Sequence, residues 1–141
     1  MPASRRFTFS KEERLCSKKL IDQLFVGGNS RSLAAFPLRA VYQLIDRHQE
    51  LGDNAPDLTT PVKILVSVPK KHFKRAVKRN RVKRQIREAY RKNKYILWDK
   101  LSETAGKEIL LAFVWLDDEL HESADVEAKV CNLMQRISER L

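Results

Sequence analysis

The sequence pattern of residues 73–91, FKRAVKRNRVKRQIREAYR, strongly constrains the secondary structure that this stretch can adopt in a folded chain. Successive residues of an α-helix are rotated by about 100°. At that rotation one narrow apolar stripe contains Val82, Ile86, Ala89 and Tyr90. The opposite face is polar and carries Asn80, Arg84, Arg87 and Arg91, with Arg81 and Lys83 on its flanks. The pattern predicts an amphipathic helix that rests on the protein body through its apolar stripe and projects its cations outward.

The positive charge of the chain is concentrated in this one element. Between Lys70 and Lys94 there are 13 Lys or Arg residues and one acidic residue, Glu88. The whole chain has 28 basic and 18 acidic residues and a formal net charge of +10, so the rest of it is close to neutral. Like charges three or four residues apart on a helix cost about 0.2–0.5 kcal/mol per pair, which an ordinary solvated helix avoids by mixing signs. The distribution therefore indicates a binding surface for a polyanion.

The composition of this helix favours RNA among the polyanions. Arginine outnumbers lysine in residues 79–91, and guanidinium groups bind phosphate in a bidentate way and stack on bases. A membrane-surface helix is disfavoured because the apolar stripe has no wedge rich in Trp, Phe and Leu. Two alternatives use the same helix: a ribosomal or RNA-chaperone type of RNA-binding protein, and a DNA-binding regulator that reads the major groove. The regulator usually needs a dimerisation element, and the sequence shows none.

Hydrophobic patterns in the rest of the chain predict two further helices and three strands. The expected elements are a helix from Ser10 to the glycines 27–28, strands at 36–45, 62–69 and 108–116, and a last helix at 123–141. Ser10 and Glu13 have the spacing of a capping box. Residues 108–116, EILLAFVWL, are typical of a strand buried on both faces.

The order of these elements is helix, strand, strand, helix, strand, helix. It predicts an α+β fold in which a small sheet has helices packed on it, as one RNA-binding domain over residues 1–141. Residues 46–60 are polar and contain Gly, Asn, Asp and Pro, so they are expected to form a loop insertion. The chain has no apolar run near the roughly 18 residues that a membrane span needs, and its first 15 residues do not resemble a secretory signal.

The sequence predicts neither a protein active site nor a metal site. It contains no HExxH motif, no Walker loop and no paired histidines at nuclease spacing. No partner can be recognised in the sequence for the three histidines, His48, His72 and His121. The acidic residues 117–119 are interpreted as a turn before the last helix. The two cysteines, Cys16 and Cys131, lack metal-type spacing and predict free thiols in a reducing cytoplasm.

Several segments resemble the bacterial ribonuclease P protein component. The stretch AVKRNRVKRQIREAYR (76–91) is similar to the Arg-Asn-Arg signature of that family. RLCSKKLIDQLFVGG (14–28) resembles its first helix, and ILVSVPKK (64–71) resembles a strand that leads into a Ser-Lys-Lys turn. The likeness covers roughly residues 13–116. It departs from the family at Ile21, where an aromatic residue is often found, at Pro69, which replaces the serine of the turn, and in the longer loop at 46–60.

The resemblance implies both a fold and a function. The fold is a two-layer α/β sandwich similar to the second domain of ribosomal protein S5. The function is that of the protein subunit of ribonuclease P, which removes the 5′ leader of precursor tRNA by endonucleolytic hydrolysis. In that family the RNA subunit carries the active site and holds most of the Mg²⁺. The expected partners are therefore the ribonuclease P RNA and precursor tRNA, in the cytoplasm, with no membrane and no evident protein partner.

The resemblance also assigns two RNA-binding surfaces. The RNA subunit is expected to contact Arg79, Asn80, Arg81, Lys83, Arg84, Arg87 and Arg91. A cleft between the sheet and the first helix is expected to bind the single-stranded 5′ leader through Ile21, Phe25, Tyr42, Lys70 and Lys71. Stacking of a base on Phe25 or Tyr42 would be worth about 1–3 kcal/mol, and burial in the core is the competing interpretation for both residues. Trp98 and Trp115 are interpreted as packing residues.

Overall fold

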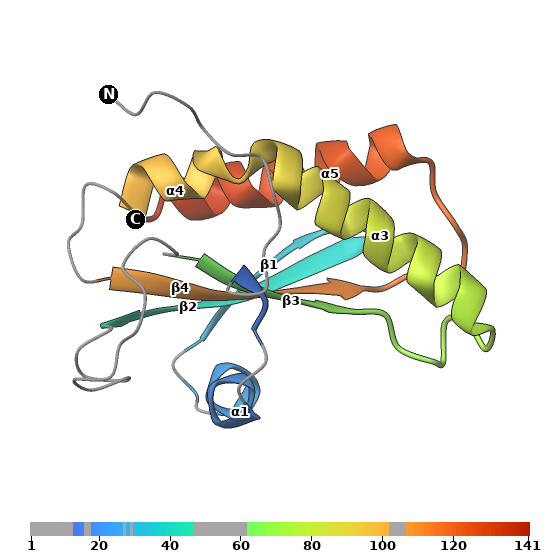
Figure 1. The fold of residues 1–141 in the computed structure, drawn as a ribbon, viewed down its shortest axis with the longest axis horizontal. Coiled ribbons are helices and arrows are strands. Elements are labelled where there is room, and N and C mark those ends of the chain that lie inside the picture. Colours follow the sequence, from blue (N-terminus) through green and yellow to red (C-terminus); the bar gives the residue numbers. More distant parts are fainter. Residues whose placement is uncertain (1–12, 16–17, 27, 29, 47–61, 102–106) are drawn as a thin grey trace.

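The computed structural model describes residues 13–15, 18–26, 28, 30–46, 62–101 and 107–141 (Figure 1). In chain order the elements are α1 (Lys18–Val26), β1 (Arg31–Ala35), β2 (Leu38–Asp46), β3 (Val62–Ser67), α3 (Ala76–Asn93), α4 (Tyr95–Leu101), β4 (Lys107–Trp115) and α5 (Ser123–Ser138). The predicted α+β class is confirmed. The likeness to ribosomal protein S5 stays a prediction.

The four described strands form one mixed sheet in the order β1-β2-β4-β3. β2 pairs antiparallel with β1 and β4, whereas β3 and β4 are parallel and are connected through α3 and α4. β4 occupies an inner position, and seven of its nine residues are buried. This confirms that EILLAFVWL is a strand covered on both faces, because its alternate residues pack in two different hydrophobic clusters, one on each side of the sheet.

α3, α4 and α5 together cover one face of the sheet (Figure 1). The predicted apolar stripe of α3 is buried there, at Val82, Ile86, Ala89 and Tyr90. α5 packs through a stripe with the same spacing, at Val126, Val130, Leu133 and Ile137. The side chains of Tyr90 and Trp98 join α3 to α4 through a hydrogen bond of 2.9 Å, in which the indole N–H donates to the phenol oxygen. Trp98 and Trp115 are packing residues, as predicted.

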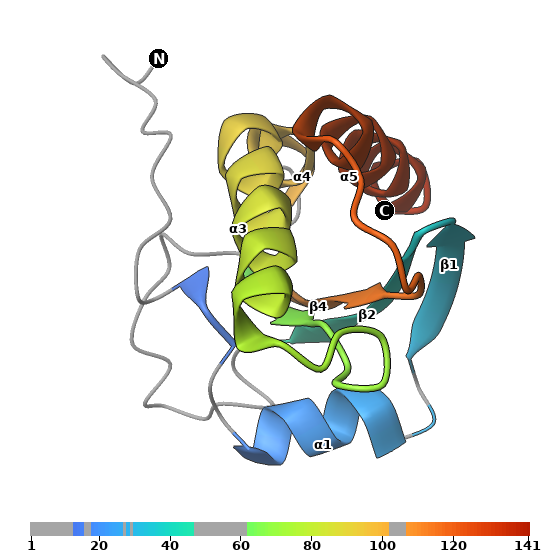
Figure 2. The same ribbon diagram turned by 90° about the vertical axis from the view of Figure 1, so that its right-hand side faces the viewer.

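The opposite face of the sheet carries α1, which Figure 2 shows alone on that side. Leu20 and Leu24 of α1 form a second, smaller core, with side chains from β2 and β4 that include Val41 and Leu110. The expectation of two layers is therefore wrong. Every central strand has apolar residues on both faces, and α1 is the element that covers the face left open by the other helices.

Two elements were not predicted from the sequence. The strand expected at residues 36–45 is the second arm of a hairpin, whose first arm is β1 and whose turn contains Phe36 and Pro37, joined by a cis peptide bond. β1 lies at the sheet edge and buries only Leu33 among its five residues, so it has no apolar pattern to recognise. α4 follows α3 with only Lys94 between them, and the sequence contains no Gly or Pro there to mark the break.

The start of α1 also differs from the expectation. The helix begins at Lys18, and residues 13–15 run instead along the edge strand β3, where the Leu15 N–H donates to the Ile64 carbonyl at 2.8 Å. Glu13 does not serve a capping box, because its carboxylate lies 2.7 Å from the Lys94 ammonium. Ser10 lies outside the described residues.

Most of the expected loop insertion at 46–60 and Cys16 also lie outside the described residues. Cys131 is a free thiol. Its pKa is raised mainly by partial burial, with a smaller contribution from the negative charge of Glu127. None of the helices in the described part of the chain combines the length and apolar character needed to cross a membrane.

Candidate RNA interface

The outward face of α3 forms one wall of a cationic groove of about 500 Å³. The groove is lined by Arg14, Asn80, Arg84, Arg87, Glu88 and Arg91. Five of these residues come from α3, at spacings that put them on the face opposite the buried stripe. The prediction that Asn80, Arg84, Arg87 and Arg91 share one exposed face is therefore confirmed.

Arg14 completes the groove from a distant part of the chain. Its backbone forms a parallel bridge with Ile64 of β3, which holds residues 13–15 beside α3. The neighbouring Glu13 is 1% exposed and its partner Lys94 is 2% exposed, so the ion pair between them is dry. The Lys94 ammonium also lies 4.4 Å from the ring centroid of Trp98, a cation–π contact. This buried anchor fixes the backbone from which Arg14 reaches the groove.

The side chains that line the groove carry more positive than negative charge. Four guanidinium groups face one carboxylate, Glu88, which pairs with Arg91. Partial burial, and then repulsion by Arg14, lower the pKa of Arg87. The guanidinium groups of Arg84 and Arg87 have no ion-pair or hydrogen-bond partner among the described residues. A bound anion would relieve this repulsion, and a guanidinium pair is well matched to phosphate oxygens.

The N-terminus of α3 adds a second cationic region. Its first turn contains no acidic residue, and no side chain caps it. The side chains of Lys74, Arg75 and Lys78 are exposed there, next to the positive end of the helix dipole. Cations at this end of the helix destabilise the free protein, and a phosphate bound near the helix N-terminus offsets that destabilisation.

Arg79 has a different position from the one expected. It lies seven residues, or about two turns, before the buried Ile86, so it starts from the inward side of α3. Its guanidinium donates to the carbonyl oxygens of Phe73 at 2.7 Å and Lys74 at 2.9 Å. Arg79 therefore holds the turn that precedes α3. Arg81 is exposed and Lys83 is half-buried, and neither lines the groove.

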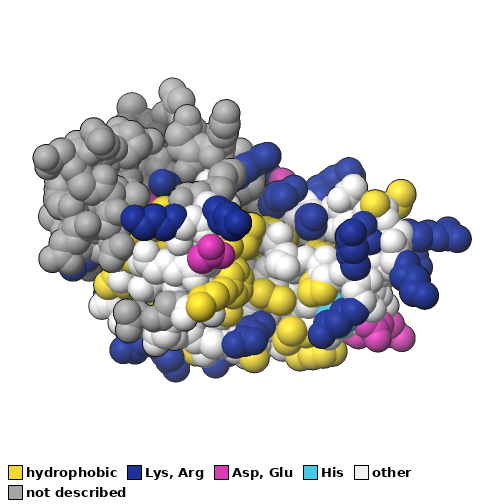
Figure 3. Space-filling view, turned by 90° about the horizontal axis from the view of Figure 1, so that it is seen from below, with side chains coloured by type: hydrophobic (Ala, Val, Ile, Leu, Met, Phe, Trp, Pro, Cys, Tyr) yellow, Lys and Arg dark blue, Asp and Glu magenta, His cyan; other side chains and the backbone are white. Residues whose placement is uncertain are grey.

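The α1 side of the molecule has apolar side chains that remain accessible. Phe25 is 46% exposed, and Ile21, one turn before it, is half-buried against the smaller core. On the sheet, Leu65 and Val114 are half-buried on this same face. Figure 3 views this side and shows hydrophobic side chains gathered across it, with Lys and Arg around them. The competing interpretation of Phe25 as a core residue is not supported.

Lys70 and Lys71 are exposed in the turn after β3, which the His72 N–H closes by donating to the Pro69 carbonyl at 3.1 Å. This turn is anchored to the segment before α5, because the His72 imidazole lies 2.6 Å from the Asp118 carboxylate. Both lysines are available to a ligand, as expected.

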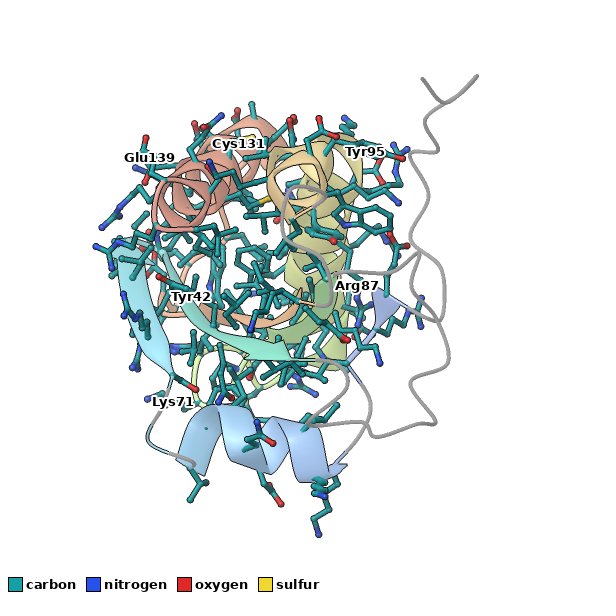
Figure 4. All side chains as sticks on the ribbon, turned by 90° about the vertical axis from the view of Figure 1, so that its left-hand side faces the viewer. Tyr42, Lys71, Arg87, Tyr95, Cys131 and Glu139 are labelled. Carbon is teal, nitrogen blue, oxygen red and sulfur yellow. The ribbon has the colours of Figure 1, made fainter. Side chains whose placement is uncertain are left out.

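Tyr42 does not lie on the α1 side, and its assignment to the leader cleft is wrong. It is 4% exposed and packs in the larger core, on the side of the sheet that faces α5 (Figure 4). Side chains alternate along a strand, so the α1 face of β2 is formed instead by Val41, Gln43 and Ile45. The Gln43 amide bridges to Gln23 of α1 at 3.4 Å.

The sequence and the fold of the chain are similar to those of known proteins. The family model described as Ribonuclease P matches residues 9–114. A Porphyromonas gingivalis protein named ribonuclease P protein component is 39% identical over 140 residues, which cover 98% of this chain and 92% of that protein. The chain belongs to the ribonuclease P protein family. Membership gives it a role in the 5′ processing of tRNA, together with an RNA subunit.

Other members of the ribonuclease P protein family are also similar. The Chlorobaculum tepidum protein of the same name is 50% identical over 58 residues, or 39% of this chain and 38% of that protein. The ribonuclease P protein of Thermotoga maritima superposes with a TM-score of 0.59 at 22% identity, over 88% of this chain and 96% of that one. The Staphylococcus aureus protein gives 0.54 at 16% identity, over 90% and 95%. At these identities the two structures establish the fold alone.

The histidines of this ribonuclease P protein have partners that the sequence did not reveal. His72 contacts Asp118, and His121 lies 2.7 Å from the Asp117 carboxylate. The hydrogen bond from His121 is the main reason that the pKa of Asp117 is lowered. Each pair joins one histidine to one carboxylate, and the described residues contain no cluster of three or more metal-binding side chains. His48 lies outside the described residues.

Sequence reasoning missed Arg14, Leu65 and Val114 as surface residues of the two faces. Arg14 was expected in a helix, and only its bridge to β3 brings it to the groove. Leu65 could have been found, because the alternation in VKILVS places it between the inward positions Ile64 and Val66. Val114 is hidden in a run of apolar residues that shows no alternation.

Proposed function

We propose that this protein is the accessory subunit of ribonuclease P, that it docks on the RNA subunit through the α3 groove, and that it holds the 5′ leader of precursor tRNA on its α1 side. The observation that carries the proposal is the groove itself. Four arginines converge there with one acidic residue among them, on the helix that carries the Arg-Asn-Arg sequence.

The α3 groove acts by replacing counterions on RNA. Arg14, Arg84 and Arg87 supply charge from two chain segments that the fold holds in place, so little ordering is needed when a phosphate binds. Each phosphate neutralised releases counterions, and the logarithm of the binding constant falls by about 0.7–0.9 per decade of salt for each such contact. Two RNA segments brought together at this groove repel each other less. Asn80 lies among the arginines and can donate to or accept from a base edge.

The α1 side suits a single-stranded leader better than a duplex. Exposed Phe25 offers a ring for base stacking, and half-buried Ile21 and Leu65 offer apolar contact. Lys70 and Lys71 lie in the turn that follows β3 and can bind leader phosphates. Contacts of this kind depend little on sequence, which suits an enzyme that processes many precursors.

The protein contributes binding, and the RNA subunit contributes the catalytic chemistry. Mg²⁺ prefers several oxygen ligands in near-octahedral geometry. Glu88 is paired with Arg91 and Asp118 with His72, and the described residues contain no group of three or more His, Cys, Asp or Glu side chains that could hold a metal ion. We assign Mg²⁺ to the RNA subunit and the site of action to the cytoplasm.

The experiment compares the affinity of the complex of protein and RNA subunit for precursor tRNA and for mature tRNA. The wild-type complex is expected to prefer the precursor. Phe25→Ala is expected to weaken precursor binding by about 1–3 kcal/mol and to leave mature tRNA binding unchanged. Val26→Ala, at the neighbouring exposed position of α1, is the matched control. An equal loss on both RNAs would show that Phe25 does not contact the leader.

A further inference from the structure

Part of the sheet face that carries α1 is left open beside that helix. The strands continue past α1 towards the N-terminal end of α3 (Figure 1). In this region the register aligns one residue from each strand, and these four residues, called the open row, are Ala34, Arg39, Val114 and Ser67. Ala34 and Arg39 are exposed and the other two are half-buried, so the described elements do not cover the row.

Arg39 is the charged member of the open row. It belongs to β2, an inner strand, and alternation puts it on the same face as Val41, which is buried in the smaller core under α1. The Nε–H of Arg39 donates to the Ser32 hydroxyl at 2.7 Å, and no carboxylate among the described residues pairs with it. This bond uses one of the five N–H donors of the guanidinium and leaves those of the two terminal nitrogens for a ligand. Arg39 is therefore a cation that is already held in place in the middle of an open sheet face.

The open row leads to the turn that carries Lys70 and Lys71. Ser67 is the last residue of β3, and the turn begins two residues later at Pro69. Neighbouring strands of a sheet are about 4.8 Å apart, so Arg39, two strands in from β3, lies roughly 10 Å from Ser67. The cations thus stand at two separate places along one line across the strands, which matches phosphates spaced along one extended chain.

The other members of the open row suit an unpaired strand of RNA. Ala34 and Ser67 have small side chains and allow a ligand to approach the sheet closely. Val114, which lies between Arg39 and Ser67 in the row, offers an apolar surface to a base or a ribose. Surfaces that bind single strands combine cations for the backbone with stacking or apolar contacts for the bases in this way.

We propose that Arg39, held by Ser32, binds a backbone phosphate of the single-stranded 5′ leader. The leader then runs across the strands from the turn with Lys70 and Lys71 to the middle of the sheet, beside α1. This inference rests on the proposed function and adds to it a route for the leader and a residue outside α1 and the turn. Arg39 was not among the site residues expected from the sequence.

The test measures the affinity of the complex of protein and RNA subunit for mature tRNA and for precursors whose leaders increase in length. Arg39→Ala is expected to bind mature tRNA and short-leader precursors as the wild type does. It is expected to bind long-leader precursors about tenfold more weakly, because a hydrogen bond to a charged group is lost. For long leaders alone, the slope of the logarithm of affinity against the logarithm of salt should fall by about 0.7. A merely structural role would affect every RNA alike.

Two companion variants separate the charge of Arg39 from its placement. Arg39→Lys keeps the charge but loses the planar fork, so its affinity for long leaders is expected to lie between those of Arg39→Ala and the wild type. Ser32→Ala leaves the guanidinium charged but no longer held, and is expected to give a smaller loss with the same dependence on leader length.

Arg31→Ala is the matched control, because it removes an exposed arginine from the edge strand β1. Arg31 is the register partner of Tyr42, so its side chain starts from the other face of the sheet, and no change with leader length is expected.

The proposal is overturned if Arg39→Ala binds all leader lengths as tightly as the wild type, or if it loses affinity equally for mature tRNA. In both cases a wild-type complex that still prefers long leaders leaves the proposed function standing. A wild-type complex that binds mature tRNA and all precursors alike would overturn the proposed function, and the role of Arg39 with it.

Discussion

The buried ion pair between Glu13 and Lys94 should contribute to the stability of the fold and should also hold Arg14 in place at the α3 groove. Its nitrogen and oxygen are 2.7 Å apart and both side chains are nearly inaccessible, so Glu13→Gln leaves an ammonium group in a dry environment. Removing one partner of a buried pair costs about 3–5 kcal/mol, which is a large part of the 5–15 kcal/mol that stabilises a typical domain. The same change should release residues 13–15 from β3 and α3, and with them Arg14.

Urea denaturation of the free protein measures the first effect, and RNA binding at fixed salt measures the second. Glu13→Gln is expected to lower the urea midpoint strongly and to weaken RNA binding. The double variant Glu13→Gln/Lys94→Met should recover much of the stability, because no buried charge is left unpaired. Glu88→Gln is the matched control for stability, since the pair of Glu88 with Arg91 is solvent-exposed and worth little. An unchanged urea midpoint for Glu13→Gln would refute the reasoning.

Three further predictions concern the α3 groove, the core beneath α3 and the acidic turn before α5. Arg84→Ala and Arg87→Ala should each reduce the salt dependence of RNA-subunit binding by about 0.7–0.9 in slope, and filter binding across a salt series measures this. Ile86→Ala should destabilise the fold by about 2–5 kcal/mol through a cavity under α3, as read from thermal unfolding. The Asp117 carboxyl should titrate below the usual value of about 3.9, because His121 stabilises its ionised form. Its contribution to stability is therefore present above that value and is lost as the pH falls through the folded pKa. His121→Ala should raise the NMR titration midpoint towards the usual value, and an unmoved midpoint contradicts the assignment.

The parts of the fold that follow from local patterns could be predicted from the sequence. The stripe of α3 and the stripe of α5 each repeat at helical spacing, so their buried faces were assigned correctly. The long apolar run of β4 predicts a buried strand, because a strand covered on both faces has few positions that suit a polar side chain. The outward cations of α3 followed from the same geometry.

The parts that depend on distant contacts could not be predicted. Glu13 and Lys94 are 81 residues apart, and nothing in either local pattern indicates that they pair. Residues 13–15 fit a helix start as well as they fit an edge segment, and tertiary contact with β3 decides between them. Tyr42 was misplaced because the alternating pattern of its strand is compatible with an aromatic residue on either face of the sheet. The helices that pack on each face decide which side chains are buried, and their positions do not follow from the local pattern.

The proposed docking of the α3 groove on a catalytic RNA can be tested directly. The most direct measurement is cleavage of a precursor tRNA at low Mg²⁺ by the RNA subunit alone, by the protein alone, and by both together. Cleavage is expected only with both, and the Arg84→Ala/Arg87→Ala protein should need a higher concentration to reach the same rate. Cleavage by the protein alone, or no stimulation by a protein that binds the RNA tightly, would contradict the proposal.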